Sequence, residues 1–124
     1  MIRSIRVVAL SFGFAMLLSA AASAGPVERR GDCVGGPGEW RLVVQREGPK
    51  SLRVRFELKE VESGGFWQLF VSDNGVGVFS ATEVAKDDEV RVRELIRDRS
   101  GLDRISATAV NMDSGATCGG SVRF

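Results

Sequence analysis

The stretch 52–59, which reads LRVRFELK, decides the fold class of this chain. Successive side chains of a β-strand point to opposite faces, so strict alternation of apolar and charged residues predicts a strand with one buried face. The apolar residues are Leu52, Val54, Phe56 and Leu58. The charged residues are Arg53, Arg55, Glu57 and Lys59. A strand that is buried on one side and solvated on the other is typical of an antiparallel sheet.

Alternation of this kind continues on both sides of the stretch. We predict six further strands, at residues 40–45, 67–71, 76–82, 89–96, 104–112 and 116–124. Clusters of Gly, Pro, Asn, Asp and Ser separate these segments at intervals typical of turns. The segment 89–96 breaks strict alternation, and we interpret the break as a bulge near Arg93-Glu94.

These segments predict an all-β fold: a seven-stranded antiparallel sandwich over residues 39–124. Strands at such spacing favour two packed sheets over a parallel sheet with crossover helices. Residues 25–38 are rich in Gly and Pro, and we expect them to form an irregular lead-in to the domain.

Residues 1–24 have the three parts of a secretory signal peptide in the right order. Arg3 and Arg6 supply positive charge, residues 7–18 are mostly apolar, and Ala22-Ser23-Ala24 matches the small-residue pattern before a cleavage site. The apolar run is shorter than the ~20 residues that span a bilayer. We therefore expect a cleaved signal peptide, an exported protein and no membrane span after cleavage.

Export bears on the two cysteines of the chain, Cys33 and Cys118, because both would reach an oxidising compartment. Two cysteines allow a single pairing. We expect a disulfide that joins the beginning of the domain to its end. A redox-active pair is the alternative, but such pairs are usually close in sequence, as in Cys-x-x-Cys.

The segment 103–111, DRISATAVN, resembles the penultimate strand of immunoglobulin-like and fibronectin type III-like domains. Trp67 resembles the third-strand tryptophan that those domains bury between their sheets. Ile105 and Ala107 stand where antibody-type domains have a corner tyrosine and an inter-sheet cysteine, so the domain is not of the antibody type. The layout is also similar to that of small exported bacterial proteins with one disulfide between the chain ends. This second resemblance implies secretion and a sandwich, without a chemistry.

The composition excludes most routes to catalysis. The chain has no histidine and no tyrosine, so it has no imidazole base and no phenol nucleophile. We therefore expect no enzymatic activity, no cofactor and no metal. The 17 basic and 16 acidic residues nearly balance, which gives no reason to expect nucleic-acid binding. We interpret the run Asp87-Asp88-Glu89 as a solvated turn, and the Arg30-Gly31-Asp32 tripeptide as a chance match to the integrin motif.

Two phenylalanines stand on the outer face of the predicted sheet. If residues 67, 69 and 71 face the core, Phe66 and Phe70 must face outward. A two-residue turn after this strand would pair Phe70 with Phe79 on the outer face. A three-residue turn would pair Phe70 with Val78 and send Phe79 into the core, and it is favoured because it hides one more ring.

An exposed apolar patch often marks a binding site. The sequence thus predicts a secreted, non-catalytic binding or interaction module whose apolar outer face includes Phe66, Phe70, Val78 and Phe79. The partner would be a protein or a small apolar ligand. One alternative is a small-molecule carrier resembling the exported chromoprotein sandwiches of actinomycetes, and another is an inhibitor of extracellular proteases.

Overall fold

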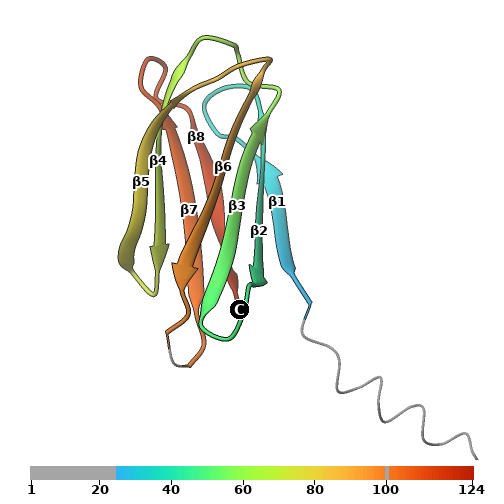
Figure 1. Cartoon of the computed structure of the whole chain (residues 1–124). Helices are drawn as coiled ribbons and strands as arrows, with labels where there is room; N and C mark the ends of the chain where they lie inside the picture. Colours follow the sequence, from blue (N-terminus) through green and yellow to red (C-terminus); the bar gives the residue numbers. More distant parts are fainter. Residues whose placement is uncertain (1–24, 100) are drawn as a thin grey trace, which may run out of the picture.

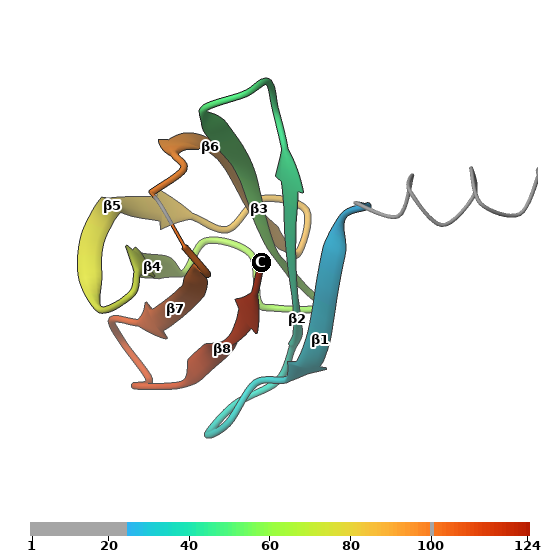
Figure 2. The same ribbon diagram turned by 90° about the horizontal axis from the view of Figure 1, so that it is seen from below.

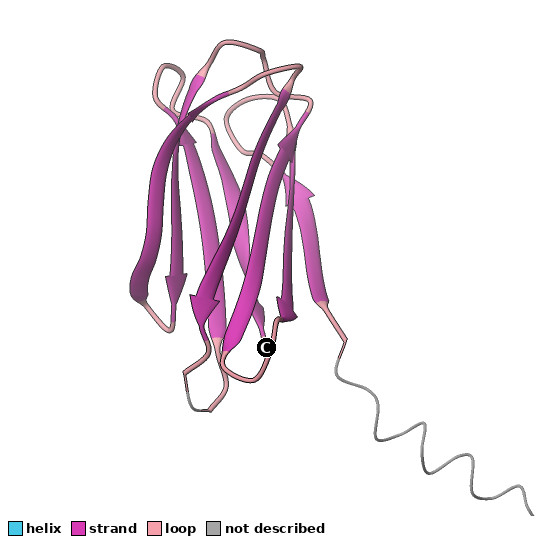
Figure 3. Ribbon diagram, viewed as in Figure 1, coloured by secondary structure: helices cyan, strands magenta, loops and turns pink. Residues whose placement is uncertain are grey.

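The structure, a computed structural model, describes residues 25–99 and 101–124, and these form eight β-strands (Figure 1). In chain order the strands are β1 (Val27–Asp32), β2 (Glu39–Arg46), β3 (Ser51–Lys59), β4 (Phe66–Asp73), β5 (Val76–Val84), β6 (Glu89–Arg97), β7 (Arg104–Asn111) and β8 (Thr117–Arg123). The part of the chain that the structure describes contains strands and loops but no helix (Figure 3). The predicted all-β fold class is confirmed.

The strands form two four-stranded antiparallel sheets, with the orders β1-β2-β3-β6 and β5-β4-β7-β8. Seen along the strands, the two sheets face each other as separate layers (Figure 2). The connections β3–β4, β5–β6 and β6–β7 each pass from one sheet to the other. The predicted antiparallel sandwich is therefore confirmed, but it has eight strands instead of the predicted seven.

The additional strand is β1, which lies in the segment predicted to be an irregular lead-in. Its residues pair antiparallel with β2. On its inner face Val27 is followed by Arg29 and Gly31, so no apolar alternation marks the strand. The ring of Trp40 occupies the space at this position, because a Cβ on Gly31 would lie only 2.7 Å from the Trp40 ring. Arg29 donates a hydrogen bond to the carbonyl oxygen of Ser121 in β8 (3.1 Å), which ties the two sheets together at this edge.

Trp40 also lies against Gly120 of β8, where a Cβ would come within 2.5 Å of the ring. We expect Gly120→Ala to lower the free energy of unfolding by about 1–3 kcal/mol, because the buried ring would have to shift in a packed core. Urea unfolding measures this effect. Gly77→Ala is the matched control, since nothing lies within 4 Å of its Cβ. An unchanged midpoint for Gly120→Ala would contradict the packing of Trp40 described above.

The core lies between the two sheets. The inner residues of the stretch 52–59 are fully buried, as their alternation predicts. The opposite sheet contributes the fully or almost fully buried residues Trp67, Leu69, Val71, Ile105, Ala107 and Ala109. Trp67, which resembles the buried tryptophan of immunoglobulin-like domains, is only 2% exposed.

The pairing of β6 with β3 corrects one prediction. Residues 89–97 pair with residues 59–51 in a continuous register, so the predicted bulge near Arg93-Glu94 is wrong. Alternation breaks there because Glu94 occupies a half-buried inner position at the edge of the sheet, while Leu95 faces solvent and is 51% exposed. The strand is regular, and only its side chains depart from the pattern.

The predicted disulfide between Cys33 and Cys118 is confirmed. The two residues are 85 positions apart in the sequence, and their Cα atoms are 4.3 Å apart. Next to the disulfide, Val34 and Thr117 exchange two backbone hydrogen bonds of 2.7 and 2.9 Å. The segment after β1 is thereby tied to the beginning of the last strand.

The predicted signal peptide, residues 1–24, lies outside the described residues. Within the described ranges, no helix has the length and apolar character that a membrane crossing requires.

Candidate functional site

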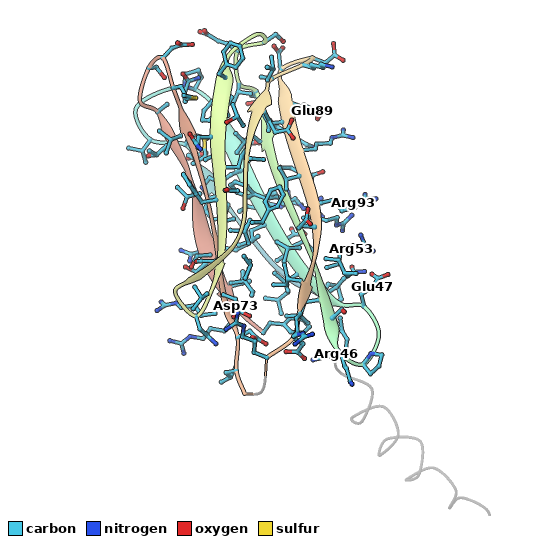
Figure 4. All side chains as sticks on the ribbon, turned by 60° about the vertical axis from the view of Figure 1, so that its left-hand side comes forward. Arg46, Glu47, Arg53, Asp73, Glu89 and Arg93 are labelled. Atoms are coloured by element: carbon cyan, nitrogen blue, oxygen red, sulfur yellow. A yellow bond between two sulfur atoms is a disulfide. The ribbon has the colours of Figure 1, made fainter. Side chains whose placement is uncertain are left out.

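Charged side chains cover the outer face of the sheet β1-β2-β3-β6. A chain of ion pairs crosses its four strands, and its members in spatial order are Glu28, Arg41, Glu57, Arg91 and Glu89. The tightest of these pairs joins Arg41 and Glu28 at 2.8 Å, and this hydrogen bond is the main reason why the pKa of Glu28 is lowered. Glu89, Arg93 and Arg53 all project away from the core on this face (Figure 4).

The Arg30-Gly31-Asp32 tripeptide lies inside the paired length of β1. Arg30 forms an ion pair with Glu28 at 2.8 Å, and Asp32 lies opposite Glu39 of β2. A tripeptide that is paired along its backbone is not presented on a protruding loop. The geometry therefore gives no support to an integrin-type motif.

The outer face of the sheet β5-β4-β7-β8 has the opposite character. Its outward side chains are uncharged along most of its length: Ser80, Thr82 and Val84 of β5, Phe66, Gln68, Phe70 and Ser72 of β4, Ser106, Thr108 and Val110 of β7, and Thr117, Gly119 and Ser121 of β8. Charged side chains occupy one end of this face, where Arg104 of β7 lies opposite Arg123 of β8. We call this surface the uncharged face.

Phe66 and Phe70 are the largest side chains of the uncharged face, and they are 50% and 47% exposed. Val84 lies directly opposite Phe66 on β5. Met112 is a further neighbour, because its backbone N–H donates to the Phe66 carbonyl oxygen (2.9 Å). The upper end of the uncharged face therefore gathers three exposed apolar side chains, with Phe70 lower on the same strand.

The β4–β5 hairpin matches neither predicted register. A two-residue Asn-Gly turn closes it, with positive φ angles at both residues. The register then shifts at a bulge, which places Phe70 opposite Ser80 instead of Val78 or Phe79. Val78 and Phe79 are both partly buried and pack against the core. They share only an open hollow at the sheet edge with Phe70, while Phe66 lies elsewhere on β4.

Asp87 and Asp88 form the turn between β5 and β6, with φ angles of 52° and 62°. The Asp88 carboxylate accepts a hydrogen bond from the Ser63 hydroxyl (2.9 Å), and the Asp88 backbone N–H donates to the same hydroxyl oxygen (2.8 Å). This arrangement fixes the turn against the β3–β4 loop. In residues 25–99 and 101–124, no three His, Cys, Asp or Glu side chains gather as metal ligands.

Three carboxyl groups meet at the end of the sandwich where β4 stops, and they belong to Asp73, Asp98 and Asp103. Asp73 and Asp103 are buried, and Asp98 pairs with Arg46 at 2.8 Å. Figure 4 shows Asp73 and Arg46 at this end of the sandwich. Burial, and then hydrogen bonds to the carboxyl groups of Asp98 and Asp73, raise the pKa of Asp103 to about 7. The hydrogen bond from Asp103, assisted by Arg46, lowers the pKa of Asp98.

Sequence reasoning missed this carboxyl cluster. Asp73 had the position of a turn residue, and Asp103 that of the residue directly before a predicted strand. Aspartates are common at both positions, and most of them are solvated. No signal in the sequence distinguishes these two, because their burial depends on the meeting of the end of β4 with the β6–β7 connection.

The sequence matches no protein-family model and no curated protein. Function is therefore inferred from the surfaces of the molecule.

Proposed function

We propose that the protein is a secreted, non-catalytic interaction module that binds a partner protein through the uncharged face. The single observation that carries this proposal is the contrast between its two outer surfaces. One sheet exposes a network of ion pairs, while the other exposes Phe66 and Phe70 among hydroxyl and apolar side chains. Large apolar side chains at the centre of a surface with few charges are typical of the core of protein interfaces.

Export is part of the same proposal. A disulfide persists in oxidising compartments, so the Cys33–Cys118 bond supports secretion. The partner would accordingly be another exported or cell-surface protein with an uncharged, partly apolar surface.

An immunoglobulin-like or fibronectin type III-like relationship belongs to this proposal too. The interleaved connections between the sheets and the buried Trp67 support it. Domains of this architecture often serve as interaction modules, which agrees with a binding role but does not identify a partner.

The two alternative functions have less support. A carrier with its ligand between the sheets needs space there, but residues such as Leu42, Phe56 and Leu69 fill that space and are fully buried. A protease inhibitor usually presents a loop that a nearby disulfide rigidifies. Here the disulfide joins a loop to β8 and clasps the two sheets.

Phe70→Ser tests the proposed face. We expect this variant to fold like the wild type, because the ring is half exposed, and to lose at least about tenfold in affinity for the partner, as the loss of an aromatic anchor implies. Leu95→Ser is the matched control, since Leu95 is equally exposed but lies on the other sheet. Partners are recovered with the secreted wild-type protein, identified by native mass spectrometry, purified, and titrated calorimetrically against each variant.

The outcome against the proposal is equally clear. The binding surface would lie elsewhere if the partner bound Phe70→Ser as tightly as the wild type. The same would follow if Leu95→Ser alone weakened binding. A large loss of stability in Phe70→Ser would assign the ring to the core.

A further inference from the structure

A second candidate site lies at the upper end of the sandwich, away from Phe70. The loops β1–β2, β3–β4 and β7–β8 border a cavity of about 390 Å³, which is in the size range of small-molecule sites. Many of the residues that line it have little or no side chain, and these include Gly35, Gly36, Gly64, Gly65 and Ala116. With so few side chains in the way, a ligand could approach the backbone and the end of the core closely.

Trp67 lines this cavity and brings a polar group that has no partner. The residue is almost fully buried, yet its indole Nε1–H donates to no acceptor in the described protein. Buried N–H groups are nearly always hydrogen-bonded, because burial without an acceptor costs free energy. The unpaired donor at the border of a cavity therefore indicates an acceptor that is not among the residues the structure describes.

Asn111 supplies a second donor beside the first. Its side-chain Oδ1 accepts hydrogen bonds from the backbone N–H groups of Asp113 (2.8 Å) and Ser114 (3.0 Å), which fixes the orientation of the amide. The Nδ2 group must then point away from this turn. It donates to no residue in the described ranges, so it is also available to a ligand.

The two donors converge where Gly65 lacks a side chain. A Cβ atom on Gly65 would lie 3.2 Å from Asn111 Nδ2, 3.7 Å from Trp67 Nε1 and 3.7 Å from the Glu62 carbonyl oxygen. A ligand hydroxyl that packs against the Gly65 Cα, just beyond this position, could accept a hydrogen bond from the two donors and donate to the carbonyl oxygen. The glycine thus leaves open the one place that an acceptor needs.

The charges around the cavity select the ligand. Glu62 and Asp113 line it, while none of its described lining residues is a lysine or an arginine. Carboxylates disfavour an anion, but they accept hydrogen bonds from hydroxyl groups. The ligand must accept hydrogen bonds from Trp67 and Asn111 and donate hydrogen bonds to the carboxylates. A hydroxyl group can do both, so a ligand with several hydroxyl groups fits the cavity.

We propose that this cavity binds a small, uncharged saccharide, with Trp67 and Asn111 donating to a sugar oxygen in front of Gly65. The site is independent of the proposed protein-binding face. Neither Phe66 nor Phe70 lines it, so the failure of one proposal leaves the other standing.

The test follows the indole N–H signals of the secreted protein by ¹H–¹⁵N NMR during titration with glucose, N-acetylglucosamine and maltose. The chain has two tryptophans, so Trp40, which packs in the core against Gly31 and Gly120, serves as an internal reference. We expect at least one sugar to shift the Trp67 signal saturably while the Trp40 signal stays in place. Glucuronate, the anionic counterpart of glucose, should bind more weakly than glucose.

Gly65→Ala should weaken sugar binding by about tenfold or more, because its methyl group would clash with a ligand oxygen that packs against the Gly65 Cα. Gly77→Ala, a matched glycine with open space around it, should bind like the wild type. Asn111→Asp is a second variant: it keeps an oxygen for the Asp113 and Ser114 N–H groups and replaces the Nδ2 donor by an acceptor. It should also weaken binding.

Three results would overturn the proposal. The first is a Trp67 signal that no neutral sugar shifts, including the case in which only a bound water satisfies the indole. The second is equal binding by the wild type, Gly65→Ala and Asn111→Asp. The third is binding of glucuronate as tight as that of glucose, since the carboxylates would then not select the ligand.

Discussion

Removal of the Cys33–Cys118 disulfide is expected to lower the free energy of unfolding by about 2–5 kcal/mol. The bond connects residues 85 positions apart, so it closes almost the whole described chain into one loop. A loop of this length restricts the unfolded ensemble strongly. For a domain of about 100 residues we expect the melting temperature to fall by at least about 10 °C.

The Cys33→Ala/Cys118→Ala double variant and the reduced wild-type protein should melt at similar temperatures. Adding the reductant to the double variant is the control, and it should change nothing. Differential scanning calorimetry measures all four samples. Equal melting temperatures for the oxidised and reduced wild type would mean that the disulfide does not hold the two sheets together.

Replacement of Asp103 by Asn is expected to stabilise the fold above pH 7 by about 2–4 kcal/mol. Asp103 is buried, and its carboxyl group lies beside those of Asp73 and Asp98. Ionisation of Asp103 therefore places a buried negative charge beside the Asp98 carboxylate. An asparagine resembles the neutral acid in shape and can still donate a hydrogen bond to a neighbouring carboxylate.

The pH dependence follows from the direction of the shift. The pKa of Asp103 is about 7 in the folded protein against 3.8 for an ordinary aspartate, so the folded state binds more protons between these values. Stability should fall as the pH rises from about 4 to about 7 and then level off. The pKa of Asp98 is shifted downward, so its contribution is lost only below about pH 4. The wild type should therefore be most stable at mildly acidic pH.

Urea unfolding at a series of pH values measures the stabilisation by Asp103→Asn and the pH dependence of the wild-type stability. Asp103→Asn should match the wild type within about 1 kcal/mol near pH 4 and exceed it above pH 7. The control is Asp87→Asn, an exposed aspartate in a turn, which should run parallel to the wild type. A wild-type stability that rises steadily up to pH 8 would contradict a protonated Asp103.

Alternation in the sequence was sufficient to predict the sandwich, because a strand that is buried on one face has apolar residues at every second position. The stretch 52–59 shows this fully, and its four apolar side chains are all buried. β1 could not be found in this way. Two of its inner positions hold Arg29 and Gly31, and the apolar side chain that lies against Gly31 is Trp40 of the neighbouring strand. When a side chain from a neighbouring strand covers the inner face of a strand, that strand needs no alternating apolar residues of its own.

The candidate sites were predictable only in part. The period of two places Phe66 and Phe70 outside, and both are exposed in the structure. The bulge in β5 exchanges the inward-facing and outward-facing positions on one side of it. The faces on which Val78 and Phe79 lie therefore depended on a detail that a turn sequence does not specify. The uncharged character of the whole face depends on which strands become neighbours. The carboxyl cluster needs the end of β4 to meet the β6–β7 connection, and the glycine-lined cavity needs three loops to meet.

Amide hydrogen exchange of the protein bound to its recovered partner tests most directly whether the uncharged face is the binding surface. We expect protection on partner binding to concentrate in β4 and β7 around Phe66 and Phe70, while β3 and β6 of the opposite sheet, whose outer faces are charged, exchange as in the free protein. Protection confined to β3 and β6, with β4 and β7 unchanged, would contradict it.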